Sequence, residues 1–208
     1  FCNWLHNERS TEWSSLTHGA YDTSTFGGTI FEFTDQLTHS PGARFWIPTL
    51  DEWVKAAFYD PARDGPGQGG YWTRANRSDG PVVYGPPGSG QANSGFQLPF
   101  FGEAEIPLGS YALEQSAYGL LDAMGGVNEW TEGVWPPAGT PRKRVVLGSS
   151  AGLLPEAADY YDALGRWELG APDPIGLRIA AQIPGPWWIT LALLGVLTRG
   201  HRSRKEYT

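Results

Sequence analysis

Two carboxylates stand on either side of a glycine pair in the segment Ser116–Thr131, which reads S-A-Y-G-L-L-D-A-M-G-G-V-N-E-W-T. They belong to Asp122 and Glu129, and the pattern around them is that of neither a helix nor a strand. Because glycine adopts positive φ at no steric cost, Gly125 and Gly126 can fold the chain back and turn carbonyls inward. Carboxylates and carbonyls together suit Ca²⁺, which takes oxygen ligands at roughly 2.3–2.6 Å. The residue types leave a second interpretation open, a turn with a solvated Asp and a Glu that caps backbone amides.

Four short motifs follow one another along the chain. They are F-C-N-W-L at 1–5, R-F-W-I-P-T-L-D-E-W-V-K-A-A at 44–57, the glycine-rich segment, and R-V-V-L-G-S-S at 144–150 with G-L-R-I-A at 176–180. In this order they resemble the motifs of the formylglycine-generating-enzyme, or sulfatase-modifying factor, family. The resemblance implies an α+β fold, a C-type-lectin-like sulfatase-modifying-factor fold that is loop-rich with few short strands and helices.

The resemblance also divides the chain into two parts. Residues 1–181 correspond to the sulfatase-modifying-factor-like domain, and we expect its N-terminal part to be missing, because the family has a first strand region before the helix that matches 1–5. Residues 182–208 hold a Pro-x-Pro sequence, an apolar stretch and a basic tail.

Two structural calcium sites are implied by the resemblance. The ligands would be, for the first site, the side chains of Asp122 and Glu129 with the carbonyls of Gly125 and Val127, and, for the second site, Asn93 with the carbonyl of Ser94. Calcium at these places would order loops that their own sequence cannot hold.

The chemistry of the family's enzymes is a different matter. Formylglycine-generating enzymes oxidise a substrate cysteine with a copper ion held by a cysteine pair shortly after R-G-G-S. The corresponding stretch here, Gly148–Trp167, contains neither Cys nor His. Soft Cu(I) selects thiolates, and the single cysteine, Cys2, matches a position in an early helix. We therefore expect no copper and no catalytic residue.

Other polar residues have structural interpretations. His6, His18 and His39 show no metal-ligand spacing and are expected to be lone surface histidines. The segment holding Tyr160, Tyr161 and Asp162 matches the part of the family that lines its cleft. These three residues could contact a ligand, or form a solvated loop with a tyrosine packed beneath it.

The run Trp187–Leu197 is almost wholly apolar and is followed by a basic cluster. As a helix it would extend about 17 Å, against a hydrocarbon core near 30 Å. The order Pro-x-Pro, apolar stretch, Arg cluster resembles the PEP-CTERM sorting signal of exported bacterial proteins, although Gly185 stands at the usual Glu. This predicts a transmembrane helix and a domain anchored at the inner membrane, outside the cytoplasm. The alternatives are a plain uncleaved anchor and a helix docked on the domain.

Composition excludes several classes of function. The net charge is −7 over 208 residues, and the basic tail leaves the rest more acidic still, so no nucleic-acid partner is expected. Ten Trp, nine Tyr and nine Phe supply a substantial core, and 28 Gly with 17 Pro favour loops. We interpret the chain as a non-catalytic binding or structural module with an unknown ligand or envelope protein as partner. The alternative is a metal-dependent oxidoreductase with an unrecognised metal site.

Few regular elements are needed to position these residues. An amphipathic helix is expected to end at His6, with Phe1, Trp4 and Leu5 on one face. A second helix is expected over Leu50–Tyr59, with Thr49 as its N-cap and Glu52 completing a capping box. Trp53 and Trp130 are expected in the core. Short strands are expected at 29–33, 106–111, 145–146 and 177–179, the last two paired with each other.

Overall fold

The protein is described from a computed structural model, which describes residues 1–28, 33–93, 106–135, 143–151, 166–167 and 175–183. Its elements are short, and loops connect most of them. In chain order they are α1 (Cys2–His6), α2 (Trp13–Thr17), the 3-10 turn η1 (Thr23–Thr25), β1 (Gly27–Gly28), β2 (Phe33–Thr34), β3 (Phe45–Trp46), α3 (Leu50–Phe58), β4 (Tyr59–Asp60), β5 (Gly70–Tyr71), β6 (Asn128–Trp135), β7 (Lys143–Leu147), β8 (Arg166–Trp167), β9 (Ile175–Gly176) and β10 (Ala180–Ala181).

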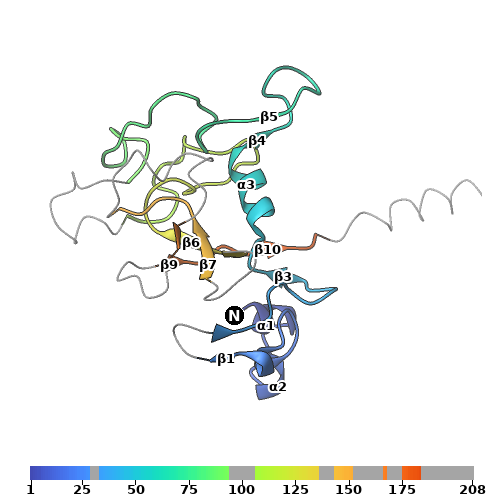
Figure 1. Cartoon of the computed structure of the whole chain (residues 1–208). Coiled ribbons are helices and arrows are strands. Elements are labelled where there is room, and N and C mark those ends of the chain that lie inside the picture. The colour runs from blue at the N-terminus through green and yellow to red at the C-terminus, as the bar shows by residue number, and fades with distance from the viewer. Residues whose placement is uncertain (29–32, 94–105, 136–142, 152–165, 168–174, 184–208) are drawn as a thin grey trace, which may run out of the picture.

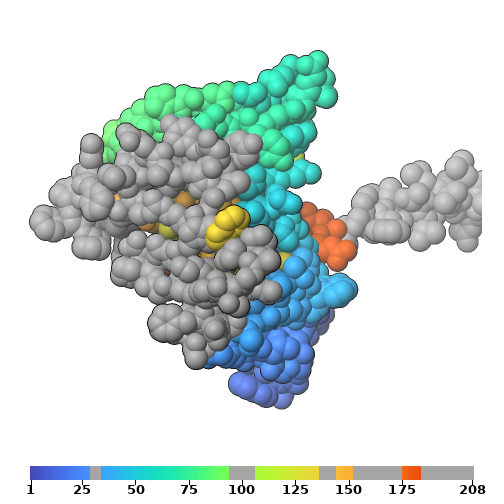
Figure 2. Space-filling model, in the orientation of Figure 1, coloured from blue at the N-terminus to red at the C-terminus, as the bar shows by residue number. Residues whose placement is uncertain are grey.

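Helix α3 lies at the centre of this arrangement (Figure 1). The hairpin of β4 and β5 extends from one end of the helix, and β3, α1 and α2 lie beyond the other end. The space-filling view shows the same order, with the N-terminal segment in blue at one pole and the residues after β4 in green at the other (Figure 2).

The start of α3 is fixed by its sequence, as expected. The Glu52 amide donates to the Thr49 hydroxyl at 3.2 Å, and the Thr49 amide donates to the Glu52 carboxylate at 2.9 Å. These bonds satisfy amides that have no partner within the first turn of a helix. The predicted capping box is thus confirmed, and the predicted helix ends at Phe58, one residue before the expected end at Tyr59.

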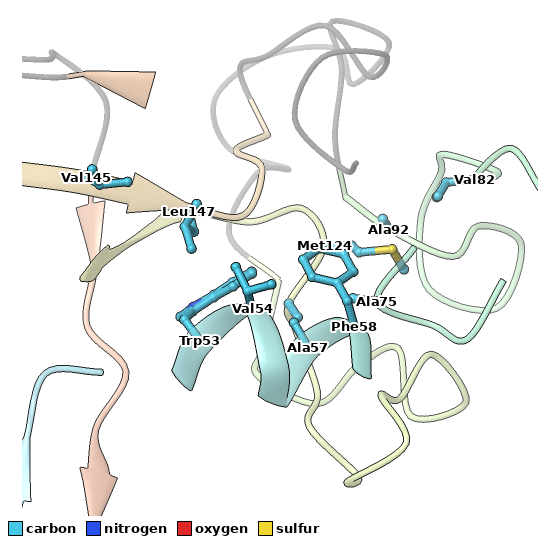
Figure 3. Packing of buried hydrophobic residues seen from close by; sticks show 11 residues of the cluster. Trp53, Val54, Ala57, Phe58, Ala75, Val82, Ala92, Met124, Val145 and Leu147 are labelled. Carbon is cyan, nitrogen blue, oxygen red and sulfur yellow. The ribbon is translucent and has the colours of Figure 1, made fainter. Parts of the chain in front are cut away.

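The first core lies on the buried face of α3 (Figure 3). Its buried aromatic residues are Trp53, with 2% of its surface exposed, and Phe58, and both belong to α3. Val54 and Ala57 of α3 pack beside them, together with side chains from the loops and from the sheet, namely Ala75, Val82, Ala92, Ala123, Met124, Val145 and Leu147. Trp53 lies in the core, as predicted. Trp130 was also expected in the core but is only half-buried.

The main sheet has four strands in the order β8-β7-β6-β9. Strands β6 and β7 are antiparallel, with an irregularity between Trp130 and Val134, and β9 runs parallel to β6. Strand β10 instead pairs with β3. The strand expected at 145–146 is confirmed within β7, but its predicted pairing with 177–179 is wrong, because β6 lies between β7 and β9.

A second, smaller core joins the N-terminal segment to β3. It consists of Cys2, Ala20, Tyr21 and Ala43, and Trp46, Ile47 and Ile179 pack against it. The backbone of Tyr21 is held by one side chain, since Asn3 Nδ2 donates to the Tyr21 carbonyl at 2.8 Å and the Tyr21 amide donates to Asn3 Oδ1 at 2.7 Å.

The apolar face expected on the first helix is not the face that the helix buries. Its buried residues are Cys2 and Asn3, while Phe1 has 69% of its surface exposed. Asn3 also donates to the Leu16 carbonyl at 2.9 Å. A buried amide that satisfies three backbone groups turns this face of the helix inward.

Two other expected strands differ in the structure. At 106–111 the chain forms a turn, in which the Ser110 amide donates to the Pro107 carbonyl at 3.2 Å and Gly109 has a φ of +78°. The expected strand at 177–179 is also absent, and residues on both sides of it form β9 and β10. Most of the strand expected at 29–33 lies outside the described residues.

Candidate functional site

Both glycines of the bend are required by its backbone conformation, and Gly125 is also required by its surroundings. Gly125 and Gly126 have φ angles of +76° and +75°. A Cβ on Gly125 would lie 2.3 Å from the Asn93 carbonyl oxygen, so only glycine fits there. The Gly126 amide donates to that same oxygen at 2.8 Å, and the Gly125 amide donates to Ser149 Oγ at 2.6 Å. The bend therefore brings Asn93 and the segment after β7 together, as a candidate ligand site requires.

Asp122 lies before the glycine pair with a left-handed backbone, at a φ of +55°. Its carboxylate accepts a hydrogen bond of 2.7 Å from the Gly109 amide. This bond ties the 107–110 turn to the bend. The carboxylate thus has a donor from the protein itself.

Glu129 lies after the glycine pair, within β6, so the end of the segment from Asn128 is a strand, and the expectation of no regular structure is wrong there. Arg178 binds its carboxylate through two bonds, from Nε to Oε2 at 2.7 Å and from Nη2 to Oε1 at 2.6 Å. The Trp53 indole donates to Oε2 at 2.8 Å. Such paired contacts between a guanidinium and a carboxylate are among the strongest hydrogen bonds in proteins.

Arg178 also reaches the backbone of the bend. Its Nη2 donates to the Leu121 carbonyl at 3.2 Å and to the Asp122 carbonyl at 3.5 Å. The guanidinium therefore links the bend to Glu129 in the strand after it, and α3 joins through Trp53, which donates to the same carboxylate.

The predicted ligands of the first calcium site thus lie on one short segment, and Asn93 lies beside it. Val127 packs closely on β9, where a Cβ on Gly176 would lie 2.6 Å from Val127 Cγ2. Within the described ranges, no group of three or more His, Cys, Asp or Glu side chains is placed to hold a metal ion. Calcium at this bend stays a prediction. Ser94, Tyr160, Tyr161 and Asp162 lie outside the described residues.

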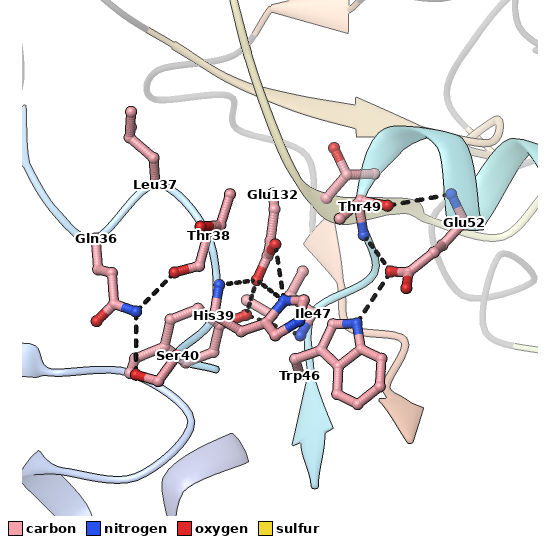
Figure 4. Close-up of polar contacts among 12 residues, drawn as sticks. Gln36, Leu37, Thr38, His39, Ser40, Trp46, Ile47, Thr49, Glu52 and Glu132 are labelled. Atoms are coloured by element: carbon pink, nitrogen blue, oxygen red, sulfur yellow. Dashed lines mark hydrogen bonds and ion pairs between the residues drawn. The ribbon is translucent and has the colours of Figure 1, made fainter. Parts of the chain in front are cut away.

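A second buried carboxylate, which sequence reasoning did not single out, belongs to Glu132 (Figure 4). Its Oε1 accepts from the Tyr21 hydroxyl at 2.5 Å and from the His39 amide at 2.8 Å. The His39 ring nitrogen Nδ1 lies 3.0 Å from Oε1 and 3.1 Å from Oε2. Because an ionised carboxylate only accepts, Nδ1 carries a hydrogen here.

His39 is therefore not the lone surface histidine that was expected. Its ring stacks on the Trp46 indole, with centroids 4.6 Å apart. The Trp46 indole in turn donates to Glu52 at 3.0 Å. Burial alone would raise the pKa of Glu52, but the hydrogen bonds from Trp46 and Thr49 lower it below its ordinary value.

The electrostatics of the second core favour neutral side chains. Burial, and then the hydrogen bond to Glu132, raise the pKa of Tyr21 well above its ordinary value. Burial also raises the pKa of the Cys2 thiol. Since the thiolate is the reactive form of cysteine, this environment makes Cys2 inert rather than nucleophilic.

Arg144 completes this region by fixing the segment that carries His39. Its guanidinium pairs with Asp35 and donates to the Gln36 and Leu37 carbonyls, each at 2.9 Å. It also donates to the Glu132 carbonyl at 2.6 Å. The segment before His39 is thereby attached to β6.

The sequence of β6 carries a signal that could have pointed to both buried carboxylates, Glu129 and Glu132. The strand sequence N-E-W-T-E-G-V-W contains Glu129 and Glu132 among residues that a sheet buries. A buried carboxylate needs a partner, but the sequence does not say which arginine, tyrosine or histidine supplies it.

The domain description that fits this architecture comes from a comparison with protein families. The model of the sulfatase-modifying factor enzyme 1-like domain matches residues 1–183. The chain belongs to this family. Together with the short helices and strands, membership confirms the loop-rich α+β fold that the motifs indicated.

The comparisons with solved structures and with curated proteins say less about this chain. A solved structure described as the crystal structure of CarF is similar at 23% identity, with a TM-score of 0.41, over 71% of this chain and 51% of that chain. The chain thus spans about half the length of CarF. No curated protein matches this member of the sulfatase-modifying factor family.

Proposed function

We propose that this chain is a non-catalytic member of the sulfatase-modifying factor family, which serves as a binding or structural module. One observation carries the proposal: the only cysteine of the chain, Cys2, is buried in the second core, and the stretch Gly148–Trp167 has no cysteine. By resemblance, the copper-binding pair of the catalytic relatives belongs to that stretch. Without that pair, the stretch offers no thiolate ligand for Cu(I).

A peptide oxidation assay tests this proposal. The full chain is incubated with Cu(I), oxygen and a cysteine-containing substrate peptide of a formylglycine-generating enzyme, with such an enzyme as positive control. We expect no aldehyde product by mass spectrometry. Copper-dependent oxidation by the wild-type chain that persists in the Cys2→Ala variant would contradict the proposal.

We further propose that residues 182–208 tether the module to a bacterial inner membrane, with the domain outside the cytoplasm. The support is the sequence order of Pro-x-Pro, the run Trp187–Leu197 and the arginine cluster. This run lies outside the described residues, and no helix among those described is long and apolar enough to cross a membrane. An envelope protein or an exported ligand would be the partner of such a module.

Fractionation tests the tether. The full chain is expected in the membrane fraction and a chain ending at Ile183 in the soluble fraction. Mature protein that keeps its C-terminus would favour a plain anchor over sorting and cleavage. Membrane association of the truncated chain would count against a tether in this tail.

A second candidate is a metal-dependent oxidoreductase of the wider family. One observation favours it: the buried carboxylate of Glu132 binds His39 Nδ1, an arrangement that orients metal-binding histidines in other proteins. Stoichiometric iron or copper in the purified full chain, lost in the His39→Ala variant, would support this function. Metal-free protein would favour the non-catalytic module.

A further inference from the structure

The bend at Gly125 and Gly126 is the place where the family resemblance implies calcium, and the contacts there point to another cation. Both carboxylates of the expected ligand set already have protein donors. Asp122 accepts from the Gly109 amide, and Glu129 accepts from Arg178 and Trp53.

We infer that the guanidinium of Arg178 takes the role of the metal ion and fastens this bend without calcium. The proposal does not depend on the function proposed above. It rests on the position of Arg178, which contacts both oxygens of Glu129 and the carbonyls of Leu121 and Asp122.

The donor geometry supports this exchange of one cation for another. A calcium ion at such a bend would collect carboxylate and carbonyl oxygens from the two sides of the glycine pair. Arg178 also spans the glycine pair, since its Nη2 contacts Glu129 Oε1 on one side and the Leu121 carbonyl on the other, although it uses the Leu121 and Asp122 carbonyls in place of those expected for calcium. A guanidinium has fixed N–H directions and keeps its charge at every pH that proteins tolerate.

Electrostatics also disfavour both cations at once. The side chains of Arg178 and Glu129 are only 23% and 11% exposed, so solvent screens their charges weakly. A divalent ion on the same carboxylate would be repelled by the guanidinium. The guanidinium already balances the charge of the Glu129 carboxylate.

Calcium binding by the wild-type chain is the first test. The full chain is dialysed against calcium and then against a chelator, and its metal content and melting temperature are measured in each state. We expect no stoichiometric calcium and a difference in melting temperature below about 1 °C. A calcium site filled to one hundred times its dissociation constant would instead raise the melting temperature by roughly 5–10 °C. Such a rise would overturn the inference.

The second test removes the guanidinium. Arg178→Met is expected to lower the melting temperature by roughly 6–12 °C, because Glu129 is left buried without its charge partner. The matched control is Arg63→Met. Arg63 is similarly exposed, at 25%, and its Nη2 pairs with Asp79 Oδ2 at a distance of 2.6 Å. This pair lies away from the bend. We expect the control to lose only about 2 °C, and equal losses in the two variants would contradict the inference.

The third test asks whether calcium can replace the lost charge. Added calcium is expected to raise the melting temperature of Arg178→Met but not that of the double variant with Glu129→Gln. A folded Arg178→Met protein whose melting temperature does not change with calcium would refute the equivalence of the two cations. If Arg178→Met does not fold, the calcium content of the wild-type chain decides the question.

Discussion

Strand β6 buries two glutamates three residues apart, and the protein neutralises them in different ways. Glu129 meets the guanidinium of Arg178, a fixed cation. Glu132 meets a tyrosine hydroxyl, a backbone amide and an imidazole. The strand is irregular between Trp130 and Val134, and the two carboxylates reach partners in different parts of the molecule.

The difference shows how one strand holds two cores together. At Glu129 the partners come from α3 and from the chain after β9, so the ion pair supports the first core. At Glu132 the partners come from the N-terminal segment, so hydrogen bonds attach the second core. A fixed charge pair is costly to break from one side, whereas a neutral acceptor can replace a carboxylate that is held mainly by neutral donors.

The largest effect is therefore expected for Glu129→Gln. Arg178 loses its charge partner in a mostly buried position, and we expect the free energy of unfolding to fall by about 3 kcal/mol. Urea denaturation measures this change. The control is Glu8→Gln, since Glu8 pairs with Arg44 at an exposed site and should cost less than about 1 kcal/mol. Similar losses in both variants would show that the pair of Glu129 and Arg178 does not stabilise the bend.

A smaller effect is expected for Glu132→Gln. The amide oxygen can still accept from Tyr21 and from the His39 backbone, so the loss should be about 1.5 kcal/mol. The same denaturation experiment compares it directly with Glu129→Gln. An equal or larger loss would mean that a protonated His39 acts here as a cation, and the contrast between the two glutamates would disappear.

The smallest effect at neutral pH is expected for Tyr21→Phe, at about 1 kcal/mol. Its pH dependence is more informative. The pKa of Tyr21 is raised by burial and by its bond to Glu132, so the folded protein favours the neutral phenol. This stabilisation is complete below the unfolded pKa of about 10 and is lost as the pH rises through the folded value.

Urea midpoints measured between about pH 8 and 11 check this sign. The wild-type midpoint should fall more steeply than that of Tyr21→Phe, and the two curves should converge at high pH. Parallel curves would show that Tyr21 does not couple folding to alkaline titration.

The sequence predicted the parts of the fold that depend on neighbouring residues. The capping box of Thr49 and Glu52, the helix that follows and the burial of Trp53 are all encoded within one turn or one helix face. Elements whose form depends on distant partners were predicted less well. The expected strand at 177–179 is one example, because Arg178 lies between two short strands and binds Glu129.

The candidate site, too, could be predicted from the sequence only where it depends on neighbouring residues. Residue types alone singled out Asp122, Glu129 and the glycine pair, since a bend with flanking carboxylates is a local pattern. They could not show that Asn93 lies against Gly125, or that His39 is bound to Glu132, because these contacts join segments far apart in the chain.

By itself, the sequence determined the family, the central helix and the sharp turn of the bend, and it determined that the stretch 148–167 lacks copper thiolates. Only the tertiary structure decided which group neutralises each buried carboxylate. The physical reason is that a charge inside a protein is satisfied by whatever donor the folded chain brings within hydrogen-bond distance, and that donor has no fixed separation along the sequence.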